Sequence, residues 1–256
     1  MKNLRKRLAC LLLSALLLIG CLPVTALAAE NGFILVVEAG GKLVIAPEYI
    51  SCTAGQTAAQ ALSASGHTFT GLDTGMISAI DGVTGNFTRS DENGNYDLSV
   101  SAASIGYLRF SEDMDSKPSD GLKQLMTAMA DYKKKDSDVQ AAAKKEYDTA
   151  SDLFVGINSE SAKTLASNLN DAVRNYENTL TGEHYAVRFT DGSAAYSDDN
   201  YPGVSITAVN AYGKQWTDDG DGVLELPKGD YTFCVEQAGL RVEGKITVSA
   251  AATVSA

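Results

Sequence analysis

The segment from Pro118 to Leu180 has the clearest periodicity in the chain: PSDGLKQLMTAMADYKKKDSDVQAAAKKEYDTASDLFVGINSESAKTLASNLNDAVRNYENTL. Its apolar residues recur every three or four positions, which places them on one face of a helix in each of three successive runs. These residues are Leu122, Leu125, Met126, Met129 and Tyr132; Val139, Ala143, Tyr147, Ala150 and Phe154; and Ala162, Leu165, Ala166, Leu169, Ala172, Val173, Tyr176 and Leu180. Because none of these helices is stable alone in water, the sequence predicts a short three-helix antiparallel bundle.

Capping residues predict where the helices begin. Ser119 follows a proline at the start of the first helix. Ser137 and Gln140 have the spacing of a capping box at the start of the second helix. Either Asn158 or Ser159 caps the third helix.

The segments on either side of the helices have the patterns of strands and turns. Residues 31–111 begin with a short apolar run of strand length, Phe33–Val37, and a second run follows the turn Gly40-Gly41. A capping-box spacing at Thr57 and Gln60 then predicts one short helix, with Leu62 as its core anchor, before further strands. This order predicts an α+β module.

Residues 183–256 alternate apolar and polar residues in five stretches separated by glycine-rich turns. This pattern predicts a small antiparallel, all-β sandwich. The chain is therefore expected to be multi-domain, with a signal peptide (1–29), the α+β module (31–111), the helical bundle (112–182) and the sandwich (183–256).

Residues 1–29 have the character of an export signal. Basic residues precede the apolar segment 8–22, which is too short to span a membrane comfortably, and small residues near Ala28 suit cleavage. The alternative is a lipobox that ends at Cys21, whose thiol would be acylated. Cleavage near Ala28 would give a secreted or cell-surface protein, whereas the lipobox would give a lipoprotein anchored at Cys21. The sequence contains no second apolar run of membrane-spanning length, so no membrane span is expected after signal removal.

The mature chain is strongly acidic. The whole sequence contains 21 basic and 32 acidic residues. Removing the four basic residues of the leader leaves 21 − 4 = 17 basic residues and a net charge of 17 − 32 = −15. A field of this sign repels phosphate, so nucleic acid is not an expected partner.

Outside the leader the cysteines are Cys52 and Cys234. Two cysteines in separate modules do not form a disulfide framework, so both are expected to be free thiols. No cluster of cysteine and histidine predicts a zinc site, and no cofactor is expected. His67 has no cysteine, second histidine or matched carboxylate nearby in the sequence, so it is interpreted as a turn or surface residue.

Trp216 and the acidic loops of the sandwich are the candidate ligand-binding residues. Trp216, the only tryptophan, would either stack on a carbohydrate or pack across the sandwich. The loops 191–201 and 217–222 flank the predicted strand 204–210, which predicts that they lie at opposite poles. Asp218, Asp219 and Asp221 would then have to bind a metal without the other loop, so the sequence predicts no metal site tighter than about millimolar for calcium.

Three stretches of the first module resemble a known family. Leu43-Val44-Ile45, then Gly55–Leu62 and Met76–Val83, are similar to the transcobalamin C-terminal-like β-grasp modules of bacterial surface proteins. The resemblance covers about 70 residues and implies a β-grasp-like fold. Some family members contact a corrinoid, but the usual closing strand is replaced here by Asp91–Tyr96, so no binding residue carries over.

The other two parts also resemble modules of Gram-positive surface proteins. The pattern from Tyr147 to Tyr176 resembles FIVAR-type helical modules. The run Gly220–Phe233, with a G-x-L-x-L-P-x-G-x-Y hairpin, resembles prealbumin-like or Ig-like repeats. These resemblances imply a modular cell-surface protein and say little about its chemistry.

The leading hypothesis is an exported, non-catalytic, modular surface protein that serves in adhesion, binding or display, with cell-wall or host glycans or proteins as partners. It depends on the export signal, on the resemblances and on the lack of a catalytic constellation in the sequence, so no enzyme is expected. One alternative is an extracellular carrier of a small, corrinoid-like ligand. Another is the accessory region of a glycan-active enzyme.

Overall fold

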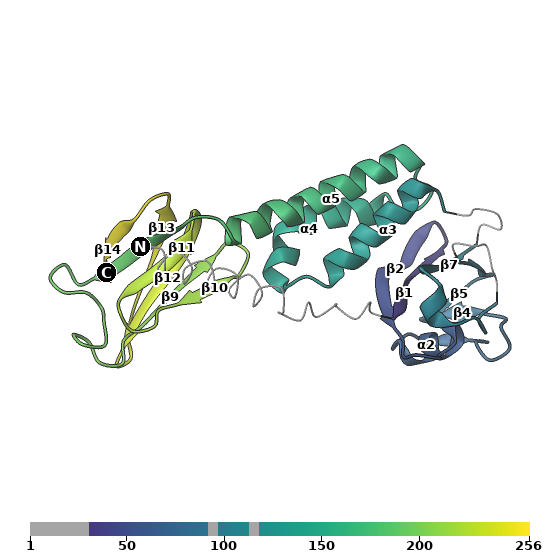
Figure 1. Ribbon diagram of the computed structural model, residues 1–256, viewed down its shortest axis with the longest axis horizontal. Helices are drawn as coiled ribbons and strands as arrows, with labels where there is room; N and C mark the ends of the chain where they lie inside the picture. Colours follow the sequence, from purple (N-terminus) through teal and green to yellow (C-terminus); the bar gives the residue numbers. More distant parts are fainter. Residues whose placement is uncertain (1–30, 92–96, 113–117) are drawn as a thin grey trace, which may run out of the picture.

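The computed structural model describes residues 31–91, 97–112 and 118–256, so the predicted signal peptide lies outside the described residues. The described residues form four α-helices and several β-sheets, which confirms the prediction of a mixed α and β protein at that level. The molecule is elongated, with strands at both ends and three long helices in the middle (Figure 1).

The first part of the chain forms a four-stranded sheet and a small three-stranded sheet. Its elements are β1 (Gly32–Ala39), β2 (Lys42–Ser51), α2 (Ala58–Ala64), β3 (Phe69–Thr70), β4 (Ala79–Ile80), β5 (Val83–Thr84), β6 (Thr88–Ser90), the 3₁₀ helix η1 (Ala102–Ser104) and β7 (Tyr107–Ser111). The sheet orders are β2-β1-β7-β6 and β3-β4-β5. β1 and β2 form an antiparallel hairpin, whereas β7 lies parallel to β1. The predicted capping box of Thr57 and Gln60 is confirmed at the start of α2.

β1 is buried on both faces of the first sheet. Phe33 and Val37 pack toward α2 in one apolar cluster. Val36 belongs instead to a second cluster, which it shares with Tyr107 of β7 and with the long helices. A strand that is covered on both faces has apolar residues at consecutive positions, which explains the sequence of residues 33–37.

The three long helices are α3 (Asp120–Lys133), α4 (Ser137–Asp152) and α5 (Ser159–Leu180). Two predicted caps are confirmed: Ser119 accepts a hydrogen bond from the backbone of α3, and Asn158 accepts one from the backbone of α5. The predicted capping box of α4 is wrong. Asp136 is the N-cap residue. The side chain of Gln140 donates to the carbonyls of residues 133 and 135 and does not accept from the backbone N–H of a cap residue, as a capping box requires.

The helices bury their apolar faces against one another and against the first sheet. Leu125 and Met129 of α3 are fully buried in the cluster that also contains Val36. The sequence prediction, in which the helices shield only one another, was therefore incomplete. The helical segment and the first sheet share one continuous apolar core.

The last part of the chain forms two facing sheets. Its strands are β8 (His184–Thr190), β9 (Ser205–Asn210), β10 (Gln215–Thr217), β11 (Val223–Pro227), β12 (Gly229–Gln237), β13 (Leu240–Val248) and β14 (Ala252–Ser255). The orders are β10-β9-β12-β13 and β11-β8-β14, and β14 lies parallel to β8. Phe189 of one sheet packs edge-on against Phe233 of the other, with ring centroids 5.2 Å apart.

Among the described residues, no helix combines the length and the apolar character needed to cross a membrane. Cys52 and Cys234 are free thiols in different parts of the molecule, at the end of the first hairpin and on β12.

Candidate functional site

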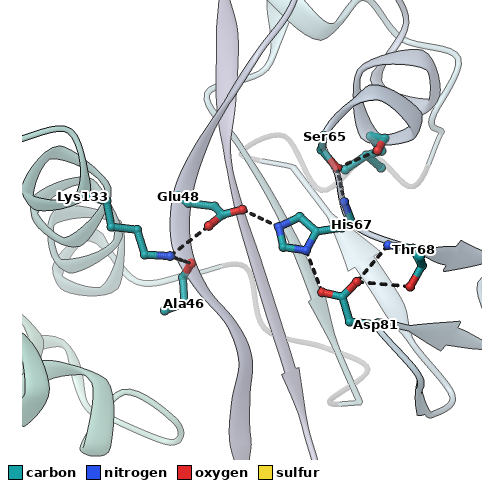
Figure 2. Close-up of polar contacts among 8 residues, drawn as sticks. Ala46, Glu48, Ser65, His67, Thr68, Asp81 and Lys133 are labelled. Atoms are coloured by element: carbon teal, nitrogen blue, oxygen red, sulfur yellow. Dashed lines mark hydrogen bonds and ion pairs between the residues drawn. The ribbon is translucent and has the colours of Figure 1, made fainter.

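His67 lies at the centre of a polar cluster that the sequence did not predict (Figure 2). It follows α2, and its two ring nitrogens face two carboxylates from other elements. Nδ1 lies 2.6 Å from Oδ2 of Asp81, and Nε2 lies 2.5 Å from Oε1 of Glu48. The interpretation of His67 as a residue without matched carboxylates is wrong, because strand pairing brings together residues 14 and 19 positions away.

The cluster extends from the first sheet to the helices. The ammonium of Lys133, at the end of α3, donates to the second carboxylate oxygen of Glu48 (2.9 Å) and to the carbonyl of Ala46 (3.0 Å). Asp81 also accepts a hydrogen bond from the backbone N–H of Thr68 (2.8 Å). The cluster therefore connects α3, β2, the segment after α2 and the turn between β4 and β5 (Figure 2).

The protonation of these groups follows from their contacts. Burial alone would lower the pKa of His67, but the hydrogen bonds to Glu48 and Asp81 outweigh it and raise that pKa above 6.5. Burial opposes the ionisation of Glu48, and the contacts with His67 and Lys133 still lower its pKa below 4.5. Burial also opposes the ionisation of Asp81, but the hydrogen bonds from the backbone N–H of Thr68 and from His67 outweigh it and lower the pKa of Asp81 below 3.8.

A neutral imidazole has one N–H, so only the imidazolium donates to both carboxylates at once. In this arrangement both ring nitrogens are engaged within the protein, and neither is available to take a proton from a ligand. The cluster is therefore a brace between the first sheet and α3.

A second polar junction connects the helices to the sandwich. The hydroxyl of Tyr176, on α5, donates to the buried carboxylate of Asp138 (3.1 Å) and accepts from the amide of Asn210 (2.8 Å). The ring of Tyr212 packs edge-on against Tyr176, with centroids 4.9 Å apart. Asn210 also holds its own turn, because its side-chain oxygen accepts the N–H groups of residues 212 and 214.

A cleft of about 550 Å³ lies at this second junction. Residues of α4, α5, the β9–β10 turn and the start of β12 line it, including Glu146, Asn175, Tyr176, Tyr212, Lys228 and Asp230. Tyr212 is 43% exposed, so one part of its ring is available to a ligand. A neighbouring hollow of about 400 Å³ shares Asn210 and Asp230 with the cleft and continues along β12 and β13.

Trp216, the sequence-predicted ligand candidate, lies on β10 and does not line this cleft. Its half-buried ring packs edge-on against Tyr231, with centroids 5.3 Å apart, at the border of the sandwich core. Tyr231 itself lines the cleft, so Trp216 contacts a residue of the cleft wall without lining the cleft.

The two acidic loops of the sandwich lie at the same pole, which corrects the prediction that they lie at opposite poles. The backbone N–H of Asp198 donates to the carbonyl of Gly220 (2.9 Å). The prediction overlooked β10, which turns back after β9 and places Thr217 opposite Thr207. The distance along one strand therefore does not separate the loops.

Asp218, Asp219 and Asp221 do come together, with one oxygen of each carboxylate within 4.8 Å of the others. Their oxygens already stabilise the loop, since Asp218 accepts from the N–H groups of Gly222 and Val223, and Asp221 accepts from Val223. Burial raises the pKa of Asp218 above 3.8 by more than these N–H groups lower it. The cluster has the carboxylates that calcium prefers, in a loop where several of those oxygens have other partners.

Comparison with models of protein families, with curated proteins and with solved structures finds no match to this chain.

Proposed function

We propose that this chain is an exported, non-catalytic, modular surface protein that binds a ligand in the cleft between its helices and its sandwich. The leader-like residues 1–29 and the acidic mature chain support export. The single observation that carries the binding function is the tyrosine-lined cleft of about 550 Å³, since ligand sites commonly lie between domains.

The arrangement of strands and helices in each part supports the proposal of a modular protein. A β-hairpin with α2 on one face and a parallel β7 supports a β-grasp-like first module. Three amphipathic helices support the FIVAR-like segment, and the two facing sheets support a prealbumin-like sandwich. Modules of this kind are combined in surface proteins for adhesion or display.

The chemistry of the cleft favours a polyhydroxylated ligand, such as a cell-wall or host glycan. The exposed part of Tyr212 offers an apolar ring face on which a sugar ring stacks. Asn175, Lys228 and Asp230 offer donors and acceptors around it. Acidic residues outnumber basic ones in the mature chain, which disfavours polyanionic ligands.

A glycan array with the mature chain tests this proposal. Replacing Tyr212 by alanine is expected to weaken binding to any positive glycan about tenfold, because it removes one ring contact. The matched control is Tyr201→Ala, a tyrosine in the acidic loop at the other pole, which is expected to leave binding unchanged. Equal effects of the two substitutions, or no binding to any glycan, would reject the cleft as the site.

The two alternatives make different predictions. A carrier of a corrinoid-like ligand changes the absorbance of that ligand on titration, and the change does not depend on Tyr212. The accessory region of a glycan-active enzyme binds glycans but increases product release only when a catalytic partner is present.

Localisation can be tested separately from binding. Simple secretion predicts that the chain is found in the medium and that Cys21→Ala has no effect on its fractionation. The lipoprotein alternative predicts membrane association that Cys21→Ala abolishes.

A further inference from the structure

β13 (Leu240–Val248) is an exposed sheet edge with a self-complementary sequence. It ends the order β10-β9-β12-β13, and no other strand among the described residues pairs with its outer side. Leu240 is 78% exposed and Val242 is 44% exposed. Both lie on the same face of the strand as Val248, which is buried in the core. Long edge strands with exposed apolar residues are sites at which another strand adds.

The register with β12 determines which backbone groups are free. The strands are joined by the two-residue turn Ala238-Gly239, whose φ angles of 50° and 82° are typical of a tight hairpin. Such a turn closes on a hydrogen-bonded pair, here Gln237 and Leu240, and hydrogen-bonded pairs then alternate along the ladder. The residues whose N–H and C=O groups point to the outer side are therefore Arg241, Glu243, Lys245 and Thr247.

We propose that β13 pairs with β13 of a second copy of this chain, antiparallel and centred on Gly244, to form a two-fold dimer. In this register Glu243 of each copy faces Lys245 of the other, so two opposite-charge pairs form across the interface. Leu240 faces Val248, and Val242 faces Ile246, so both exposed apolar residues gain a partner. All nine residues of the strand are paired.

The centre of the interface suits close approach. Gly244 lies on the two-fold axis and has no side chain, so nothing obstructs the pairing of the two backbones there. The ring of Phe233 occupies the space beside it, since a Cβ at Gly244 would lie 2.4 Å from that ring.

Charge selects this register over the nearest one. A shift of one residue, centred on Glu243, would place Arg241 of each copy opposite Lys245 of the other and Glu243 opposite its own copy, and these three like-charge contacts would destabilise it. A shift centred on Val242 also forms opposite-charge pairs, between Arg241 and Glu243, but it pairs only the first five residues of the strand. The full-length register is the one that satisfies both charge and length.

Sedimentation of the mature chain over a range of concentrations tests the dimer. The wild-type chain is expected to change from the mass of one chain to that of two as concentration rises. Lys245→Glu is expected to weaken the dimer about tenfold, because two attractive contacts become repulsive. The double variant Glu243→Lys, Lys245→Glu restores opposite charges across the interface and is expected to recover dimerisation.

The control is Lys145→Glu, which makes the same charge change on an exposed position of α4 and is expected to leave the dimer unchanged. Melting curves of all variants show whether each one is folded. A chain that stays monomeric at every concentration overturns the proposal. So does a dimer that Lys245→Glu leaves intact, or one that the double variant fails to restore.

Discussion

The helical segment is attached to its two neighbours in different ways. Toward the first sheet the contact is a shared apolar core, in which Val36 and Tyr107 belong to the same cluster as Leu125 of α3. The ion pair of Lys133 with Glu48 lies beside it. Toward the sandwich the contact is a small set of polar and aromatic groups around Tyr176.

The two kinds of contact determine which parts of the chain fold together. Burial of apolar surface contributes about 25 cal/mol per Å², so a shared core ties the stability of its two sides together. A single hydrogen bond contributes only about 1 kcal/mol net, so the contacts of Tyr176 orient the sandwich without making it part of the same unit. We expect the first sheet and the helices to unfold as one unit and the sandwich to unfold on its own.

The largest expected effect is that of Leu125→Ala. Leu125 is fully buried in the shared core, so its truncation should destabilise that unit by about 2–5 kcal/mol. Helix circular dichroism should report a lower melting temperature. The fluorescence of Trp216, the only tryptophan, reports the sandwich and should be unchanged. If the circular dichroism and the fluorescence transitions shift together, the sandwich unfolds with the rest of the chain and the two junctions couple their neighbours equally.

The next effect is that of His67→Gln, expected at about 1 kcal/mol or less because the cluster is partly exposed. The raised pKa of His67 means that its contribution is fully present below 6.5 and is lost as pH rises through the raised value. The lowered pKa values of Glu48 and Asp81 mean that theirs are present above 4.5 and 3.8 and are lost as pH falls.

The wild-type chain should therefore exceed His67→Gln in stability most clearly between pH 4.5 and pH 6.5. Urea titrations across this range measure the difference in the free energy of unfolding. A difference that is constant with pH would contradict the brace. Lys133→Met tests the same brace from α3 and should lower stability while leaving the pKa of His67 raised.

The next substitution, Asn210→Ala, is expected to change the geometry of the junction between helices and sandwich more than the stability of the chain. The substitution removes the hydrogen bond to Tyr176, worth about 1 kcal/mol, together with the two bonds that the Asn210 side chain accepts within its own turn, and it should loosen the sandwich relative to the helices. Spin labels on Cys52 and Cys234, in the two end modules, give the distance distribution between them. It should broaden in Asn210→Ala and stay narrow in the control Asn170→Ala, an exposed position of α5.

The smallest expected effect is that of calcium on the sandwich. Several carboxylate oxygens of Asp218 and Asp221 already accept backbone N–H groups, so we expect affinity no better than about millimolar. The melting temperature of the sandwich, followed by Trp216, should rise measurably only at calcium concentrations well above millimolar. A rise at micromolar calcium would identify these aspartates as a metal site.

Local patterns predicted the helices well because each of them depends on neighbouring residues. Ser119, Asn158 and Thr57 cap the helices at the expected places, since a capping bond joins residues only a few positions apart. The cap of α4 was misplaced by one residue, because Asp136 and Ser137 are both suitable cap types.

Contacts between distant residues could not be predicted in the same way. Glu48, Asp81 and Lys133 reach the site through strand pairing and helix docking, and nothing in the sequence near His67 marks them. One long-range feature does have a local signal: the uninterrupted apolar run of 33–37 indicates a strand covered on both faces. The acidic loops were misplaced because the short strand β10 was not recognised.

Both β-rich parts hold their first and last strands side by side and parallel, β1 with β7 and β8 with β14. The chain enters each pair at one end and leaves it at the other. When the molecule is pulled from its two termini, the strands of each pair are drawn in opposite directions along their length. Their interstrand hydrogen bonds then share the tension and must break together rather than one after another. Parallel pairing of the first and last strands therefore makes each β-rich part resistant to unfolding by a force applied along its length.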